Sequence, residues 1–166
     1  MFPDELMIAA SEFIATCRER RLTVACAESC TGGLICALLT EIPGASEVFT
    51  HGFVTYANQA KIRMLGVPEA LLVAHGAVSE PVARAMAEGA LAVARVDLAL
   101  ATTGVAGPGG GTPAKPVGLV HIGVASSTGP TRHARHMFDN RSRAAHRLAS
   151  AGAALQLAFD TSGIGL

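Results

Sequence analysis

The chain has 166 residues, half of them hydrophobic but only 4% aromatic, and it contains no tryptophan. This length suits a single domain over residues 1–166, with a core of Ala, Val, Leu and Ile side chains. The formal net charge of zero argues against a general attraction to nucleic acid or to an anionic membrane. No apolar run approaches the ~20 residues of a membrane span, and the first residues lack the pattern of a signal peptide. We therefore expect a soluble, cytoplasmic protein.

Helical and extended patterns alternate along the first half of the chain. Apolar residues recur at helical spacing over residues 4–20, with acidic residues at the start and basic residues at the end. The patterns that follow predict, in order, a buried strand over 22–27, a helix after Ser29 that runs to about residue 41, a turn over 42–46 and a strand or strand pair over 47–56. Within that last segment, Gly52 is expected to form a bend or a bulge.

Turn residues divide the second half of the chain into shorter elements. Asn58 is a candidate cap for a helix that ends at Leu65, and Ser79 is the candidate N-cap of a helix that reaches about residue 94. The remaining patterns predict a helical piece over 68–73, strands over 96–102, 117–126 and 132–138, a final helix from Asn140 or Ser142 to about residue 159, and a frayed tail over 160–166. This order predicts an α/β fold, a three-layer α/β/α sandwich around a mixed β-sheet that a hairpin closes.

One stretch, residues 25–33, places hydroxyls, an acid, a thiol and two glycines between a predicted strand and a predicted helix. The carboxyl edge of a sheet is where α/β proteins bind ligands, and a helix start there offers unpaired N–H groups. Ser29 is therefore a candidate nucleophile beside a ready-made oxyanion site. The alternative is that Ser29 or Thr31 only caps the helix, which is a common role for both residue types.

A second stretch, residues 52–61, holds the only tyrosine of the chain, Tyr56, and a lysine in the first turn of a predicted helix, Lys61. A cation at that place opposes the helix dipole, so it is a poor position for a structural lysine. It suits a lysine whose pKa is lowered by burial until it acts as a general base, which takes the serine proton either directly or through a Tyr56 hydroxyl that lies between them. The alternative makes Tyr56 an ordinary strand residue and Lys61 a solvated charge.

A third stretch, residues 103–116, is a loop rich in glycine and proline after a predicted buried strand. Such a loop lets backbone N–H groups approach an anion, and Lys115 adds a positive charge. Its spacing matches neither a Walker A sequence nor the dinucleotide-binding fingerprint. After the last predicted strand, Arg141 or Arg143 is a candidate to bind a phosphate in bidentate fashion, and a solvated helix start is the alternative.

The cysteines and histidines do not predict a metal site. None of the four cysteines forms a CxxC pair, and only Cys30, beside Ser29, is a candidate reactive thiol. The six histidines form no HExxH motif, and His133 and His136 are expected on opposite faces of a strand. We therefore expect neither a metal nor a cofactor.

In this order, the stretches resemble the CinA C-terminal domain family, the nicotinamide-nucleotide amidohydrolases. The matching segments are residues 27–33, 52–61, 76–79, 104–118 and 138–141, and the resemblance covers roughly residues 5–157. Each segment alone is a weak signal, and their succession makes the resemblance specific. It implies a deamidase that converts nicotinamide mononucleotide and water into nicotinic acid mononucleotide and ammonia.

The resemblance also implies roles for single residues. Ser29 is the nucleophile, and Tyr56 with Lys61 activates it. If so, we expect the capping to fall to a neighbour such as Thr31, and our mechanistic hypothesis is that backbone N–H groups near residues 30–33 stabilise the oxyanion. The expected substrate contacts are Cys30, Thr31, Gly32, Gly33, Thr103, Gly104, Gly107, Gly110 and Arg141.

Two other functions stay open. The domain could bind a nicotinamide nucleotide without hydrolysing it, or serve as an accessory protein in DNA uptake or damage response, which only the family name suggests. Neutral charge and the lack of a basic, aromatic-rich stretch argue against direct contact with DNA. We expect a small-molecule substrate as partner, no nucleic acid and no membrane, and a homodimer that packs through Ala-rich helices is a further hypothesis.

Overall fold

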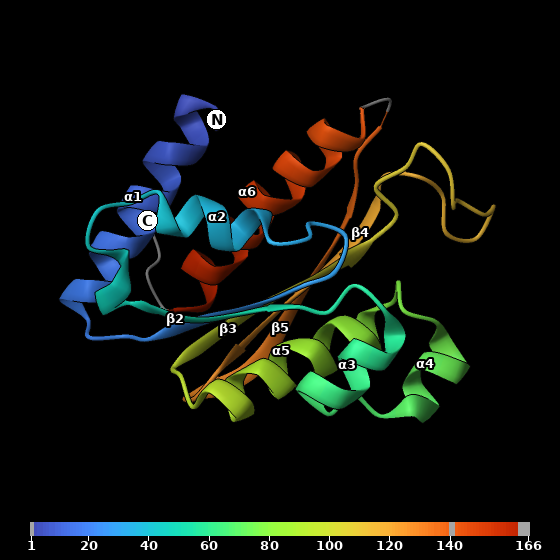
Figure 1. Ribbon diagram of the computed structural model, residues 1–166, viewed down its shortest axis with the longest axis horizontal. Coiled ribbons are helices and arrows are strands. Elements are labelled where there is room, and N and C mark those ends of the chain that lie inside the picture. The colour runs from blue at the N-terminus through green and yellow to red at the C-terminus, as the bar shows by residue number, and fades with distance from the viewer. Residues whose placement is uncertain (1, 140–141, 163–166) are drawn as a thin grey trace.

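Figure 1 shows a twisted β-sheet between two layers of helices. The computed structural model describes residues 2–139 and 142–162. Its strands are β1 (Val24–Glu28), β2 (Phe49–Val54), β3 (Leu98–Gly104), β4 (Leu119–Ser126) and β5 (Gly129–Met137). Its helices are α1 (Asp4–Glu19), α2 (Leu34–Thr40), α3 (Asn58–Leu65), α4 (Glu69–His75), α5 (Glu80–Ala94) and α6 (Arg143–Thr161), with a short 3-10 turn, η1 (Ala45–Glu47). The predicted three-layer α/β/α sandwich around a mixed sheet is confirmed.

The sheet has the strand order β2-β1-β3-β4-β5. β1 pairs in parallel with both β2 and β3, whereas β4 and β5 are antiparallel and form the predicted hairpin. The carboxyl ends of the three parallel strands therefore meet at one edge of the sheet, which is where ligands bind in open α/β folds. No helix among the described residues has the length and hydropathy needed to cross a bilayer.

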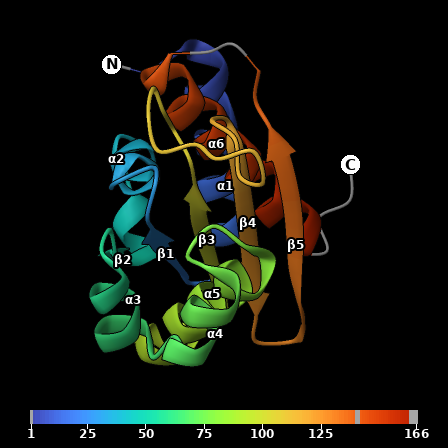
Figure 2. The same cartoon turned by 90° about the vertical axis from the view of Figure 1, so that its right-hand side faces the viewer.

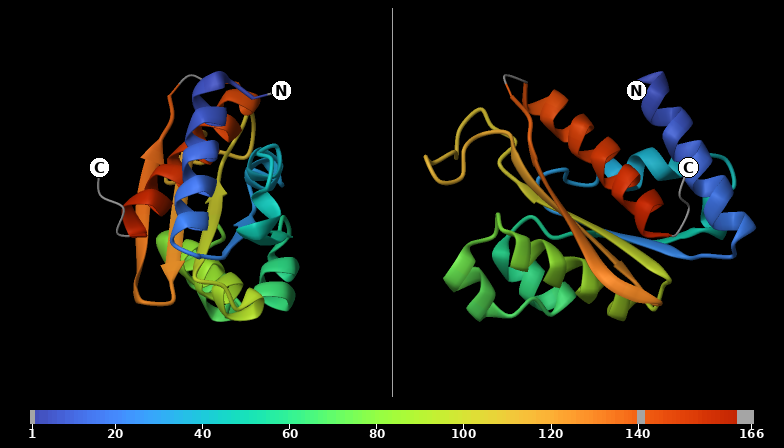
Figure 3. Two further views of the ribbon diagram at one scale, coloured as in Figure 1. Left: turned by 90° about the vertical axis from the view of Figure 1, so that its left-hand side faces the viewer. Right: turned by 180° about the vertical axis from the view of Figure 1, so that it is seen from behind.

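The two faces of the sheet carry side chains of different size. Figure 3 shows α1 and α6 over one face, and α3, α4 and α5 over the other. In β1 and β3, the first face carries Val24, Cys26, Leu98 and Leu100, and the second carries Ala25, Ala27, Ala99 and Ala101. These alanines let α5 lie close to the sheet, where a Cβ at Gly123 would stand 2.5 Å from the Ala83 carbonyl oxygen. Close packing of small residues thus replaces aromatic bulk in this layer.

The structure of β2 and of the start of α3 differs in detail from the prediction. The irregular pairing of β2 with β1 falls at Thr50, so the predicted bulge at Gly52 was wrong. Gly52 instead allows a close approach, because a Cβ there would lie 2.6 Å from the Cys36 Sγ. Asn58 is the first residue of α3, and the N-cap position belongs to Ala57.

The later helix ends were predicted more closely. Ser142 is the N-cap of α6, and its hydroxyl accepts a hydrogen bond from an N–H group of the first turn. Asn140, the other candidate, lies outside the described residues. Ser79 holds the N-cap position of α5, but its hydroxyl donates to the Gly76 carbonyl and does not cap the helix. α6 extends to Thr161, so the first part of the expected frayed tail is helical.

Candidate active site

Ser29 lies directly after β1, at the edge where the parallel strands end. Its N–H group donates to the Thr102 carbonyl of β3, which ties the serine to the centre of the sheet. Lys61 reaches the same point from the first turn of α3. The distance from the Lys61 Nζ to the Ser29 Oγ is 2.9 Å. A serine and a lysine that are far apart in the sequence therefore form one hydrogen-bonded pair.

The amino group of Lys61 is buried among neutral oxygens. The residue is 1% exposed, and its Nζ lies 2.8 Å from the Thr55 carbonyl oxygen and 3.4 Å from that of Tyr56. Among the described residues, no carboxylate lies within ion-pair distance of it. Burial therefore lowers the pKa of Lys61, and the nearby Cys30 thiol partly opposes this shift. The amine donates to the Ser29 Oγ and to the two carbonyl oxygens. Its neutral form has a lone pair that can instead accept a hydrogen bond from the Ser29 hydroxyl.

The hydroxyl of Tyr56 is not placed between the serine and the lysine. The Tyr56 side chain is 60% exposed, and its hydroxyl accepts a hydrogen bond from the Arg143 guanidinium at 2.9 Å. Lys61 contacts Ser29 directly. Of the two expected routes, the structure shows the direct contact and not the relay through the Tyr56 hydroxyl, and the part of Tyr56 that faces Lys61 is its carbonyl.

A cavity of about 290 Å³ opens beside Ser29 and Lys61. The loop between β3 and β4 forms part of its wall, and Figure 2 shows this loop at the same end of the molecule as the start of α6. Arg143, the first residue of α6, joins the two sides, because it donates to the Gly107 carbonyl at 2.7 Å and to the Tyr56 hydroxyl. The cavity therefore has a serine hydroxyl bonded to a buried amine at one place on its wall and a guanidinium at another.

The structure brings most of the predicted contact residues to this cavity. On its wall lie Cys30, Thr103, Gly104, Gly107 and Gly110. Thr31, Gly32 and Gly33, although described, lie in the serine loop and not on that wall. Arg141 lies outside the described residues, and the arginine that lines the cavity is Arg143.

Sequence reasoning gave no contact role to six of the lining residues, which are Asn58, Ala77, Val78, Val105, Ala106 and Gly109. Asn58 lies one turn before Lys61, and the other five belong to segments that match the family pattern. The Thr103 hydroxyl donates to the Ala77 carbonyl at 2.8 Å, which fixes this part of the wall. Lys115 was considered for an anion, but it donates to the His75 carbonyl and does not line the cavity.

The helix after the serine loop is capped by Glu28, which sequence reasoning did not single out. Its buried carboxylate accepts hydrogen bonds from the N–H group of Gly33 and from two N–H groups of α2, at 2.8–3.1 Å. The expected cap, Thr31, was wrong, because its hydroxyl shares a 2.7 Å hydrogen bond with the Thr102 hydroxyl. The N-cap position is Gly33, which has no side chain to accept a bond. A glycine there was the available signal that an acceptor from elsewhere is required.

The Cys30 thiol lies at the site without the properties of a nucleophile. Burial raises the pKa of this thiol to about 11. It is therefore protonated at neutral pH, and a thiol must be ionised to react readily.

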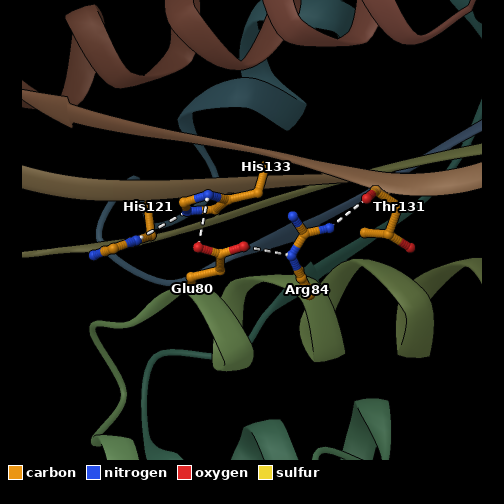
Figure 4. A network of polar contacts seen from close by, with 5 residues as sticks. All are labelled: Glu80, Arg84, His121, Thr131 and His133. Carbon is orange, nitrogen blue, oxygen red and sulfur yellow. Dashed lines mark hydrogen bonds and ion pairs between the residues drawn. The ribbon is translucent and has the colours of Figure 1, made fainter.

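A second group of ionisable side chains lies between α5 and the β4–β5 hairpin (Figure 4). His121 Nδ1 is 2.9 Å from His133 Nε2, and His133 Nδ1 is 3.4 Å from a Glu80 oxygen. Glu80 also pairs with Arg84 at 2.8 Å. Burial lowers the pKa of His121 to about 4 and lowers the pKa of His133. The part of the chain that the structure describes holds no set of three His, Cys, Asp or Glu side chains arranged to bind a metal ion.

Known proteins resemble this chain in both sequence and structure. The model of the CinA C-terminal domain family matches residues 7–161. A CinA-like protein of Chlorobaculum tepidum is 62% identical over 108 residues, which is 65% of this chain and 26% of that protein. The competence/damage inducible protein CihA from Agrobacterium tumefaciens has a TM-score of 0.96 at 44% identity, over 98% of both chains. A CinA superfamily protein from Escherichia coli has a TM-score of 0.87 at 30% identity, over 94% of this chain and 91% of that chain. The chain spans about a quarter of the length of the first curated relatives that it matches.

Proposed function

The chain belongs to the CinA C-terminal domain family, and we propose that its site hydrolyses the carboxamide of nicotinamide mononucleotide to nicotinic acid mononucleotide and ammonia. One observation carries the proposal: Lys61 Nζ lies 2.9 Å from Ser29 Oγ in a buried place, with no carboxylate beside it in the described chain. Burial lowers the pKa of Lys61 and so favours its neutral form, which is a base that can activate a serine nucleophile.

The first half of the proposed reaction transfers the acyl group to the enzyme. Lys61 accepts the hydroxyl proton while the Ser29 Oγ bonds to the carboxamide carbon. The positive pyridinium ring withdraws electrons from that carbon, so the substrate itself favours the attack. Lys61 then gives the proton to the amide nitrogen, the C–N bond breaks, and ammonia leaves.

The second half repeats the chemistry with water. Lys61 accepts a proton from a water molecule, and the oxygen of that water bonds to the acyl carbon. The proton passes to the Ser29 Oγ as the ester bond breaks, which releases nicotinic acid mononucleotide. One water is consumed over the cycle, and both side chains regain their starting protonation.

The phosphate of the substrate is assigned to Arg143, in place of the expected Arg141. The guanidinium of Arg143 contacts a carbonyl and a phenol, both neutral, and it forms no ion pair among the described residues. A guanidinium without a counter-charge at a small cavity suits a phosphate, which it binds in bidentate fashion. Gly110 has a φ of +83° and open space beside it, so the loop backbone is accessible to the same ligand.

The test is ammonia release from nicotinamide mononucleotide by Ser29→Ala. We expect a loss of at least ~10³-fold, because removal of a serine nucleophile disables both halves of the reaction. Ser127→Ala, an exposed serine after β4, is the control and should match the wild type. Turnover by Ser29→Ala at the wild-type rate would remove Ser29 as the nucleophile. Binding of the nucleotide by the wild type without ammonia release would instead identify a non-catalytic binding domain.

A further inference from the structure

The carboxylate of Glu28 lies one residue before the proposed nucleophile and is fully buried. Its Oε2 accepts hydrogen bonds from the Gly33 N–H at 2.9 Å and the Ile35 N–H at 3.1 Å, and its Oε1 accepts one from the Cys36 N–H at 2.8 Å. Within the described residues no cationic side chain forms an ion pair with it. The N–H donors and the positive end of the α2 dipole therefore stabilise this charge.

Glu28 thereby occupies the N–H groups that a helix start otherwise leaves free. Other N–H groups of the loop are bonded internally: Gly32 donates to the Ser29 carbonyl, and the first residue of α2 donates to the Thr31 carbonyl. In residues 28–36, all described, the N–H groups of Cys30 and Thr31 are the ones for which no carbonyl or carboxylate acceptor is found. Of these two residues, Cys30 lines the cavity beside Ser29.

From this distribution of donors we propose that Glu28 is a positioning residue of the site, and that the N–H group of Cys30 donates to the oxyanion formed on the substrate. The proposal rests on the proposed function, in which Ser29 attacks a carbonyl carbon. Glu28 fixes the end of the serine loop and so keeps the Cys30 N–H in place. The N–H group of the residue after the nucleophile serves the same purpose in hydrolases of other folds.

Both oxygens of Glu28 are needed for this role. Glutamine has nearly the same shape, but it offers one oxygen and one NH₂ group, and that NH₂ group would face an N–H donor. Glu28→Gln therefore loses at least one of the hydrogen bonds that hold the loop. A displacement of reacting groups by about 1 Å costs up to ~10²-fold in rate.

The test compares Glu28→Gln with Asp97→Asn as a matched control. Asp97 is another carboxylate that binds the backbone, since it accepts from the Thr23 N–H and the Thr23 hydroxyl, both at 2.8 Å, at the far end of β1. Each variant is assayed for ammonia release and for labelling of Ser29 by a fluorophosphonate, followed by intact mass. Labelling forms an Oγ–P bond with loss of fluoride, so it needs the oxyanion donor but no amide substrate.

We expect Glu28→Gln to lower kcat and the labelling rate by ~10-fold to 10²-fold, with KM unchanged. The midpoint of the pH–rate profile should also stay in place, because Lys61 is unaltered. Asp97→Asn should lower Tm and leave kcat and labelling unchanged. Glu28→Asp, which keeps the charge but shortens its reach, should give an intermediate loss, and it decides the question if the glutamine variant does not fold.

Wild-type kcat and labelling in Glu28→Gln would overturn the proposal, and so would a raised KM at unchanged kcat. If the wild type labels at Ser29 but releases no ammonia, the proposed substrate fails while the ratio of labelling rates still decides the role of Glu28. If Ser29 does not label in the wild type, both the nucleophile and its positioning residue are overturned.

Discussion

Two places in this protein hold ionisable side chains with lowered pKa values, one in neutral surroundings and the other among charged side chains. Lys61 faces the Ser29 hydroxyl and two carbonyl oxygens, all neutral. His121 and His133 belong to a cluster that includes Glu80 and, through it, an arginine (Figure 4). In both places burial is the largest cause of the shift, because it disfavours the charged form.

The different surroundings indicate different roles for Lys61 and for the histidine cluster. In the histidine cluster, charges of both signs join α5 to β5, and Arg84 also donates to the Thr131 carbonyl of β5. The Lys61 amine has no such compensation in the described chain, and it lies against a hydroxyl at the wall of a cavity. We infer that the histidine cluster holds elements together and that the lysine is kept ready to accept a proton.

The largest effect should come from Lys61→Met, which removes the base but keeps an apolar stem of similar length. We expect ammonia release to fall by at least ~10³-fold, comparable to the loss of the nucleophile itself. Stability to urea should be unchanged or higher, because the free-energy cost of burying an ionisable amine is removed along with its hydrogen bonds to neutral oxygens. Lys115→Met, at the other lysine of the chain, is the control. High activity with methionine at position 61 would place Lys61 in a structural role.

The pH dependence of the wild-type rate tests whether Lys61 acts as a neutral base. Only the neutral amine can take the Ser29 proton, and burial lowers the pKa of Lys61 from the ordinary value of 10.5. The rate kcat/KM should therefore rise with pH, with a midpoint below that value, and fall as the amine is protonated at lower pH. A midpoint at or above the ordinary lysine value would contradict a buried base.

Arg143→Ala should have an intermediate effect, on binding more than on chemistry. If the guanidinium holds the phosphate, KM for nicotinamide mononucleotide should rise ~10-fold to 10²-fold, as expected for a lost charge-assisted contact. The riboside of nicotinamide, which lacks the phosphate, serves as the control substrate, and its KM should change little. Equal losses on both substrates would assign Arg143 to the shape of the cavity, since it also holds the Gly107 carbonyl.

The histidine cluster should respond to acid through stability. The pKa of His121 is lowered from 6.5 to about 4, so the unfolded chain binds more protons than the folded chain between these values. Stability to urea should therefore fall as pH falls through this window, by on the order of 1–3 kcal/mol for this group.

His121→Asn, whose amide can still contact His133, isolates this contribution. The variant should lose less stability between pH 6.5 and pH 4 than the wild type does. An identical pH dependence in the two proteins would show that His121 does not titrate as its burial indicates.

The smallest effect is expected for Tyr56→Phe. Its hydroxyl contacts Arg143 and lies apart from the serine–lysine pair, so kcat should change less than ~3-fold, which corresponds to under about 0.7 kcal/mol. A modest rise in KM would follow from a freer Arg143. A loss of kcat as large as that of Lys61→Met would restore Tyr56 as the relay between Lys61 and Ser29.

Much of the fold could be predicted from the sequence, because the spacing of apolar residues indicates which face of a helix or strand is buried. Alternating patterns and turn residues placed the strands and helices within a few residues, and two adjacent extended patterns predicted the hairpin of β4 and β5. Its turn lies at residues 127–128, whereas the sequence pointed to Gly129 and Pro130, which are the first residues of β5. The bulge at Thr50 was not readable, since it depends on pairing with β1 and not on a local signal. Gly52 is required by the passing Cys36 side chain, which lies on another element.

The residue types of the site could be predicted from the sequence, but several of their contacts could not. The position of Lys61 in a first helical turn pointed to an unusual lysine, and the structure places it against Ser29. The direction of the Tyr56 side chain was not readable, because this residue lies between β2 and α3, where no periodicity applies. The capping by Glu28 was missed because the carboxylate reaches forward from a strand, whereas capping rules look to the residues next to the helix.

The distribution of the site along the chain has a consequence for its biosynthesis. Within this domain Ser29 and Lys61 are synthesised first, the loop that carries Gly107 follows, and Arg143 comes with α6. Because β3 must pair with β1 before the loop can face the serine, a nascent domain carries the serine–lysine pair without a complete cavity. We expect the cavity to be complete only after α6 has left the ribosome and packed onto the sheet. The order of synthesis within the domain thus places the serine–lysine pair before the wall that completes its cavity.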